Sequence, residues 1–148
     1  MTLADEFLAL SPEQRRSVHF VLCQHALDKW ASYTDTRDKI RYVETVAGTQ
    51  QEVDKQLPFD SFDVAKKGLD SRNVVERYRE PIVALQDEDL EFPENITFAY
   101  YAIYNLFKKY VKREVIDDWL IVNQALSTED DSDIWNILLS NAIQMSKQ

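Results

Sequence analysis

Residues 92–113 read FPENITFAYYAIYNLFKKYVKR, and this segment carries the strongest structural signal in the chain. At 100° per residue, its apolar side chains form one broad face, which consists of Ile96, Ala99, Tyr100, Ile103, Leu106, Phe107, Tyr110 and Val111. The opposite face is also apolar in the first half and turns polar in the second. Because a helix that is apolar all round is buried, we expect neighbours on both sides of the first half. The segment therefore predicts a central, aromatic-rich helix over about residues 94–113.

Both ends of this segment carry helix-boundary signals. Pro93 and Glu94 suit a first helical turn, because proline lacks an N–H that would have no partner there and an acid favours the positive end of the helix dipole. Four basic residues at positions 108–113 suit the negative end. Local chemistry therefore defines both termini of the predicted helix.

Helical spacing continues through most of the remaining chain. Only two glycines and four prolines occur in 148 residues, which favours helices with short connections over sheets and their turns. Ser11 and Gln14 predict a capping box around Pro12, so a helix is expected from there to about residue 33. A second helical pattern covers residues 40–57.

Two positions interrupt these patterns. Gly48 is expected to break the helix over residues 40–57 or to make it irregular, because glycine is a poor helix former. A short helix capped by Asp60 or Ser61 follows. Pro81 is expected to kink or divide the next helix, because proline removes one backbone hydrogen bond and clashes with the preceding turn.

Two further helices are expected after the central one. Val115, Trp119, Val122 and Leu126 have helical spacing, although residues 119–122 could also form a short buried strand. A last helix follows, whose predicted buried stripe consists of Ile134, Trp135, Leu138, Leu139, Ala142 and Met145. The sequence thus predicts one all-α domain over residues 1–148, a compact bundle of about six or seven helices around the central one.

The charge of the chain is strongly acidic. Net charge is 17 − 26 = −9. Residues 86–107 hold five acids and no base, and residues 114–148 hold seven acids and one base. A field of that sign repels nucleic acid and anionic membranes and attracts basic partners. It also keeps a protein soluble, and this simpler explanation stays open.

The single cysteine and the absence of targeting signals bear on the compartment. Cys23 alone excludes an internal disulfide and is compatible with a reducing compartment. The first residues lack the basic segment of a secretion signal, and no apolar run approaches the ~18 residues of a membrane span. We therefore expect a cytoplasmic protein that does not bind membranes.

Few residues suggest catalysis or metal binding. His19 and Cys23 are four positions apart on one helix face, a spacing that could offer two metal ligands or a thiol with a base. However, a structural zinc site needs four ligands, and the apolar neighbours of Cys23 raise a thiol pKa. The sequence also lacks a glycine-rich phosphate loop and a nucleophile elbow. We therefore expect no enzyme, no cofactor and no metal, with a half-buried His19 beside a core thiol.

A resemblance adds a functional expectation. Residues 92–107, FPENITFAYYAIYNLF, and residues 118–126, DWLIVNQAL, resemble the helical immunity proteins that accompany bacterial polymorphic and contact-dependent toxins. The likeness covers roughly the C-terminal half of the chain. It implies a small cytoplasmic inhibitor that binds one cognate toxin domain, commonly a basic nuclease, through an acidic surface.

Two acidic segments and three aromatic side chains are the candidate contacts for such a partner. Acids steer a basic partner towards the surface, and a buried aromatic anchor supplies affinity. The candidates are Asp87, Glu88, Asp89, Glu91, Phe92, Glu94, Tyr101, Glu129, Asp130, Asp131, Asp133 and Trp135. Tyr100 and Phe107 are expected in the core, whereas Phe98 and Tyr101 either pack in the core or bind a partner.

Two alternative functions stay open. A helical adaptor or regulatory module, which could form a homodimer, would expose a large apolar patch. A hydrolase that uses paired carboxylates or His19 with Cys23 would need a pocket whose titratable groups have shifted pKa values. We rank the inhibitor first, the adaptor second and the enzyme third.

Overall fold

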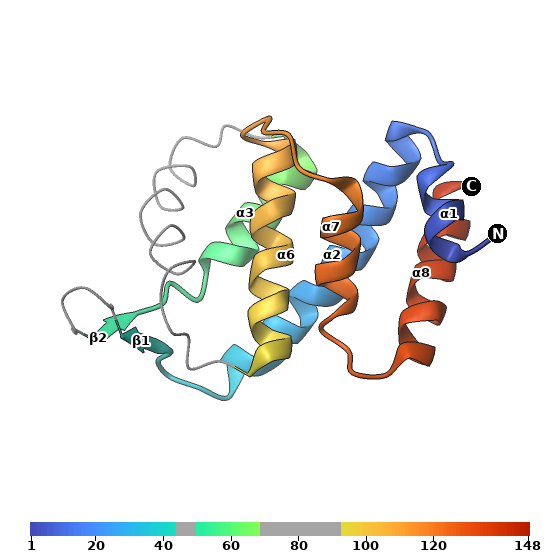
Figure 1. The fold of residues 1–148 in the computed structure, drawn as a ribbon. Coiled ribbons are helices and arrows are strands. Elements are labelled where there is room, and N and C mark those ends of the chain that lie inside the picture. Colours follow the sequence, from blue (N-terminus) through green and yellow to red (C-terminus); the bar gives the residue numbers. More distant parts are fainter. Residues whose placement is uncertain (44–49, 69–92) are drawn as a thin grey trace.

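The computed structural model describes residues 1–43, 50–68 and 93–148. Within these residues the chain forms six helices and one antiparallel hairpin, namely α1 (Leu3–Leu8), α2 (Pro12–Asp35), β1 (Arg41–Val43), β2 (Gln50–Glu52), α3 (Leu57–Lys67), α6 (Glu94–Tyr110), α7 (Asp118–Leu126) and α8 (Ser132–Ser146). The helices pack as a bundle in which α6 lies between α3 and α7 (Figure 1). The predicted all-α class and the central aromatic helix are confirmed, and the helix count agrees with the prediction.

Helix α6 packs against α2, α3 and α7, and residues on both of its sides are buried, as predicted. It ends at Tyr110 instead of continuing to residue 113. Arg113 adopts a left-handed conformation with φ 59°, and the N–H of Glu114 turns back to donate to the carbonyl oxygen of Lys108 at 3.0 Å. This bond satisfies a carbonyl of the last turn, so the chain leaves the helix earlier than its apolar pattern suggests.

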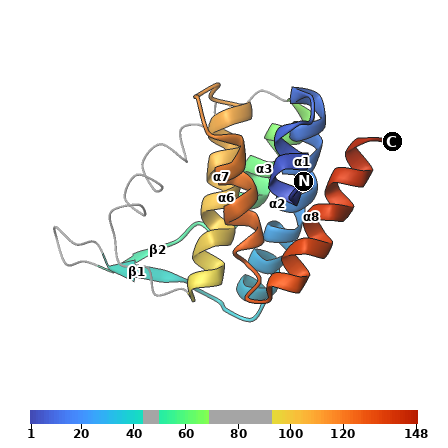
Figure 2. The ribbon, with the colours of Figure 1, turned by 45° about the vertical axis from the view of Figure 1, so that its right-hand side comes forward.

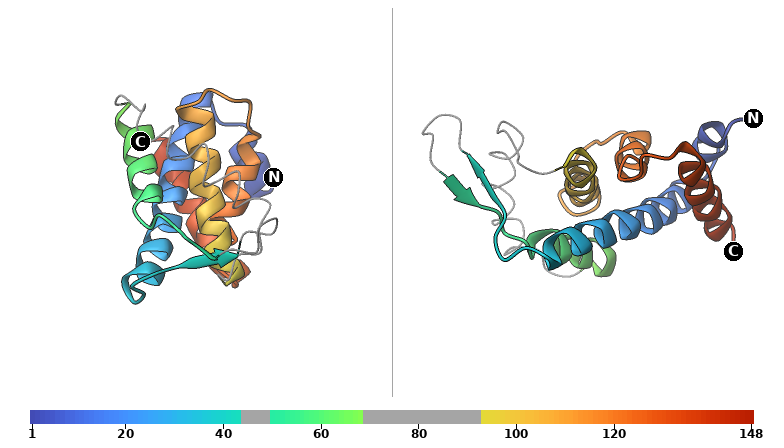
Figure 3. Two further views of the ribbon diagram at one scale, coloured as in Figure 1. Left: turned by 90° about the vertical axis from the view of Figure 1, so that its left-hand side faces the viewer. Right: turned by 90° about the horizontal axis from the view of Figure 1, so that it is seen from below.

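Helix α2 begins as predicted. The hydroxyl of Ser11 accepts from the N–H of Gln14 at 3.2 Å, and the amide oxygen of Gln14 accepts from the N–H of Ser11 at 3.0 Å. On its inner face, Val18, Leu22, Ala26, Leu27 and Trp30 are buried. Seen from below, α6 and α7 lie on the same side of α2 (Figure 3, right). Although α2 has 24 residues, none of the described helices is both long and apolar enough to cross a membrane.

The helix predicted over residues 40–57 is wrong. In its place, β1 pairs with β2 in an antiparallel hairpin, and the N–H of Val53 donates to the carbonyl oxygen of Ile40 at 2.7 Å. Both side chains are 4% exposed, so they reach the core across a hairpin instead of along one helix face. β-branched residues favour strands, but their spacing in this segment also fits a helical period, which is why the sequence predicted a helix.

Helix α3 ends at Lys67, and the next residue, Gly68, adopts a left-handed φ of 68°. It begins at Leu57, before the predicted caps, because Pro58 suits a first helical turn. The expected irregularities at Gly48 and at Pro81 lie outside the described residues.

Helix α7 settles the alternative for residues 119–122, which are helical and do not form a strand. The carboxylate of Asp117 caps the helix by accepting from the N–H of Trp119 at 3.2 Å. Val115, which the helical spacing placed on this helix, lies before its first residue and is fully exposed.

The predicted stripe of α8 is partly wrong. Leu139 and Ala142 are buried as predicted, but Ile143 is buried in place of Met145, which is 53% exposed. Ile134 is exposed as well. Helix α8 lies at the edge of the bundle, where it contacts chiefly α2 and α1 (Figure 2). A helix at an edge buries only a narrow face, which explains the difference.

The core consists of two clusters that share α6. The larger cluster joins α6 to α1, α2, α7 and α8. The second cluster packs α3 and the base of the hairpin against α2 and another side of α6, and it contains Trp30, Tyr100 and Phe107. The predicted core positions Tyr100 and Phe107 are confirmed, since both are at most 1% exposed.

Candidate functional site

The N-terminus of α6 and the connection between α7 and α8 meet at one end of the bundle (Figure 1). A cavity of about 240 Å³ lies there, lined by Glu94, Asn95, Phe98, Ser127, Glu129, Asp130 and Trp135. We call it the acidic cavity. The structure thus brings Glu94 together with Glu129 and Asp130 of the second acidic segment and with the aromatic candidate Trp135, although Glu94 is far from them in the sequence.

Glu129 is held in place by two side chains of α2. Its Oε1 lies 2.6 Å from Nζ of Lys29 and 2.9 Å from Nε2 of His25. The hydrogen bond from Lys29 is the largest cause that lowers the pKa of Glu129. The charge of Glu129 therefore fastens the α7–α8 connection to α2 and contributes less to the outer field of the protein.

Trp135 forms a fixed aromatic wall of the acidic cavity. Its indole N–H donates to the backbone carbonyl oxygen of Glu129 at 2.6 Å, and its half-buried ring packs against the larger core cluster. Rigid, partly exposed aromatic rings of this kind serve as anchors in protein interfaces, because little entropy is lost when a partner covers them. The geometry therefore suits the anchor role predicted for Trp135.

The remaining acids at this end are exposed. Glu94, Asp130 and Asp133 have no cationic partner among residues 1–43, 50–68 and 93–148, so their charges face solvent. Asp131 caps α8 by accepting from the N–H of Asp133 at 2.8 Å. Asp131 and Asp133 adjoin the acidic cavity in sequence but do not line it.

The other candidates fall elsewhere. Tyr101 is half-buried against the second core cluster, where its ring lies edge-on to Tyr100, and it does not line the acidic cavity. Phe98, which the sequence left undecided, does line it. The candidates that lie outside the described residues are Asp87, Glu88, Asp89, Glu91 and Phe92.

Sequence reasoning missed the residues that support this site. Asn95 and Ser127 carry no distinctive signal in the sequence. His25 and Lys29 are four positions apart on α2, which could have indicated a shared face. That this face meets Glu129 depends on how α2 packs against the α7–α8 connection, and helical spacing contains no such information.

His19 lies at a junction of three helices. It is fully buried, not half-buried as predicted. Its Nε2–H donates to the carbonyl oxygen of Asp118 at 2.8 Å, and its Nδ1 accepts from the hydroxyl of Tyr110 at 2.7 Å. A carbonyl oxygen only accepts, so this pair of bonds fixes the tautomer. Burial is the main cause that lowers the pKa of His19 from 6.5 to about 4.

A cavity of about 250 Å³ beside this junction is lined in part by Tyr110 and Asp118. Burial raises the pKa of Tyr110, and the carboxylate of Asp118 lies 2.8 Å from Nζ of Lys109 and 3.3 Å from Arg15. Since both ring nitrogens of His19 are engaged and Asp118 is ion-paired, the arrangement joins α2, α6 and α7 and leaves His19 no free lone pair for a base.

Cys23 is buried, and its Sγ lies 3.8 Å from the carbonyl oxygen of Ala102. Burial raises the pKa of its thiol, so little reactive thiolate forms. We predict that a thiol reagent such as Ellman's reagent labels the native protein only as fast as the chain opens. The check is the absorbance of the released thiol with and without guanidinium, where the denatured chain should give one equivalent. Rapid labelling of the native protein would contradict the buried placement.

Across the described part of the chain, no three His, Cys, Asp or Glu side chains are grouped as a metal site requires.

Comparison with protein-family models, with curated proteins and with solved structures gave no significant match. Functional inference therefore depends on the geometry of the chain itself.

Proposed function

We propose that this protein binds and neutralises a cognate bacterial toxin domain, a basic nuclease being the partner that its charge suits best. The observation that carries the proposal is the meeting of Glu94, Glu129, Asp130 and Trp135 around one acidic cavity. Glu94 thus shares one surface with two acids of a distant segment and with an aromatic anchor.

The exposed acids have a kinetic role in this proposal. A nuclease binds phosphates, so its cleft is basic, and an acidic surface accelerates the encounter by electrostatic steering. Glu94, Asp130 and Asp133 supply the outer field, since Glu129 is already paired with Lys29. Trp135 and Phe98 then supply apolar area that the partner covers.

Two matched double variants test the role of these charges. Glu94→Gln with Asp130→Asn should slow association with the basic partner about fivefold at low salt. The control is Glu13→Gln with Glu114→Gln, which removes the same charge and likewise includes an acid from the first turn of a helix. The measurement is stopped-flow association with the toxin domain, which the proposal predicts to be encoded beside this gene. Equal slowing by both double variants would mean that net charge, not the acidic cavity, governs binding.

A variant of the anchor tests affinity separately. Trp135→Ala should raise the dissociation rate by a factor of about 30, because a central aromatic anchor is worth about 2 kcal/mol. Urea unfolding of the same variant shows whether the free protein stays folded, and co-expression with the toxin shows whether growth rescue is lost. The absence of any complex between the wild-type protein and the toxin domain would refute the proposal.

The adaptor alternative has one observation in its favour. Ile134, Ile137 and Met145 lie within one face of α8 and are exposed at 37%, 59% and 53%. Such a face could be covered in a homodimer. Sedimentation velocity distinguishes the two ideas, because a stable dimer that Ile137→Lys dissociates supports the adaptor, whereas a monomer that binds the toxin supports the inhibitor.

A further inference from the structure

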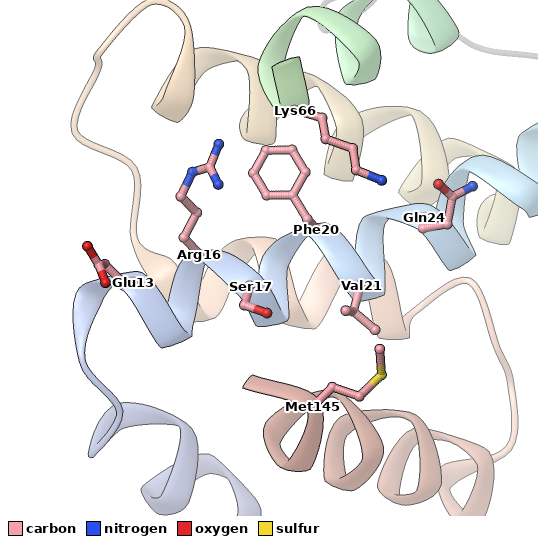
Figure 4. Close-up of a pocket in the computed structure, with 8 residues that line it drawn as sticks. All are labelled: Glu13, Arg16, Ser17, Phe20, Val21, Gln24, Lys66 and Met145. Atoms are coloured by element: carbon pink, nitrogen blue, oxygen red, sulfur yellow. The ribbon is translucent and has the colours of Figure 1, made fainter. Parts of the chain in front are cut away.

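A larger pocket lies between α2, α3 and α8 (Figure 4). Its volume is about 440 Å³, which is within the range of about 300–1,000 Å³ of small-molecule sites. It shares no lining residue with the acidic cavity. The role proposed for that cavity therefore does not explain it.

The apolar part of this pocket combines a fixed ring with an adaptable side chain. Phe20 is 8% exposed, and its ring is braced by Phe62 at 5.7 Å and Tyr110 at 5.5 Å. Val21 and Met145 point towards each other across the gap between α2 and α8 (Figure 4). The flexible thioether of Met145 can adjust to an apolar chain that enters the pocket.

Two cations flank Phe20. In Figure 4, Arg16 lies on one side of the ring and Lys66 on the other. The guanidinium carbon of Arg16 is 4.5 Å from the centre of the Phe20 ring, and its Nη2 donates to the carbonyl oxygen of Ala65 at 3.4 Å. Aromatic and carbonyl contacts therefore orient Arg16 while other N–H donors stay available.

Both cations differ from their sequence neighbours. Arg15 is paired with Asp118 at 3.3 Å, and Lys67 is paired with Asp63 at 2.8 Å. Within the described residues, neither Arg16 nor Lys66 has a carboxylate partner. In a chain of net charge −9, two cations without acid partners beside an apolar pocket indicate a place for an anionic group.

Among the described residues, Glu13 is the one acid that lines the pocket. The carboxylate of Glu13 lies beyond Arg16 and points away from Phe20 (Figure 4). Its charge opposes an anionic ligand, and this opposition is stronger for a doubly charged phosphate than for a single carboxylate. The pocket therefore suits a ligand with one negative charge.

We propose that this pocket binds a small amphipathic carboxylate. The aliphatic chain of this ligand lies between Phe20, Val21 and Met145, and the carboxylate of the ligand faces Arg16 and Lys66. Each methylene that enters the pocket should tighten binding by up to about fourfold. Octanoate should therefore bind more tightly than hexanoate.

The two methionines allow a direct test. In protein labelled with ¹³C at the methionine methyl groups, Met145 reports on the pocket and Met1, which is 94% exposed, serves as the reference signal. Titration with monomeric octanoate should shift the Met145 signal in a saturable manner, with little change at Met1. Octylammonium, which has the same chain and the opposite charge, should bind about tenfold more weakly or not at all.

Matched variants assign the charges. The double variant Arg16→Gln/Lys66→Gln should weaken octanoate binding about tenfold. Lys67→Gln changes an adjacent cation that is already paired, and it should change binding less than about twofold. Glu13→Gln should tighten binding, because it removes the opposing charge. Circular dichroism tests whether each variant remains folded.

Several outcomes would overturn the proposal. These are no shift of Met145, an equal response to octanoate and octylammonium, or an equal loss of binding with Arg16→Gln/Lys66→Gln and with Lys67→Gln. A shift produced by a short peptide ending in leucine, but not by octanoate, would also overturn it and would mark the pocket as a peptide-docking site.

Discussion

Replacing Trp30 with alanine is expected to lower the free energy of unfolding by about 3–5 kcal/mol, the usual cost of removing a fully buried large aromatic side chain. Trp30 has no exposed surface, and its ring centre lies 5.2 Å from that of Tyr100. Its indole N–H also donates to the carbonyl oxygen of Lys55 at 3.0 Å. One side chain thus joins α2 to α6 and to the segment that follows the hairpin.

The loss should be large because the surrounding elements cannot close the cavity easily. The second core cluster draws its members from α2, α3, α6 and the base of the hairpin, so several elements would have to shift together to fill the space. Since native domains are stable by only about 5–15 kcal/mol, the variant should unfold at much lower urea concentration than the wild-type protein.

Trp30→Phe is the matched control. This variant keeps most of the ring volume but removes the N–H that donates to the carbonyl oxygen of Lys55. It should therefore lower the free energy of unfolding by about 1–3 kcal/mol. The measurement is urea unfolding followed by far-ultraviolet circular dichroism, with the slope against urea concentration checked for each variant. A loss below about 1 kcal/mol for Trp30→Ala would mean that Trp30 does not hold this cluster together.

Local chemistry explains which elements could be predicted from the sequence. The capping box of Ser11 and Gln14 involves residues three positions apart, and the structure shows both of its hydrogen bonds. Helix α6 could be predicted equally well, because only a helix that is buried on several sides needs apolar residues all round. Both signals lie within a few turns of the same segment.

Features that depend on distant contacts could not be predicted. Ile40 and Val53 meet across a hairpin, but their spacing also fits a helix, and only the pairing distinguishes the two. The buried face of α8 depends on where α2 and α1 contact it, so Ile143 is buried and Met145 is exposed. The spacing of apolar residues locates the buried face of a helix to within a residue or two. The packing of neighbouring helices decides which residues at the edge of that face are buried.

The candidate site shows the same division. The acids and Trp135 could be named from the sequence because their residue types suit an interface with a basic partner. Their meeting depends on how α6 packs beside α7, which helical spacing alone does not determine. The pairing of Glu129 with Lys29 could not be predicted either, and it changes which acids remain available to a partner.

Lowering the pH from 7 to 5 is expected to reduce the free energy of unfolding by about 2 kcal/mol through His19 alone. The native pKa of His19 is about 4, whereas the ordinary value is 6.5. Between these two pH values, His19 binds a proton in the unfolded chain but stays neutral in the native protein. The contribution of neutral His19 to the free energy of unfolding is therefore fully present above pH 6.5 and is lost as the pH falls towards 4.

The hydrogen bonds of His19 give this loss its structural cause. In the neutral ring, Nδ1 accepts from the hydroxyl of Tyr110 while Nε2–H donates to the carbonyl oxygen of Asp118. Protonation places a second N–H against that hydroxyl and buries a charge without exposure to water. The carboxylate of Asp118 offsets part of this cost, whereas Lys109 and Arg15 add to it.

His19→Phe separates this effect from the titration of other groups. The variant should be less stable at pH 7, because Tyr110 and the carbonyl of Asp118 lose their partner, but its stability should change far less between pH 7 and pH 5. Tyr110→Phe keeps the imidazole and removes the hydroxyl that stabilises its neutral form, so its pH dependence should be intermediate. Most carboxylates stay ionised above pH 5, so they contribute little to the comparison. Urea unfolding of the three proteins at both pH values provides the measurement, and an unchanged pH dependence in His19→Phe would show that another group carries it.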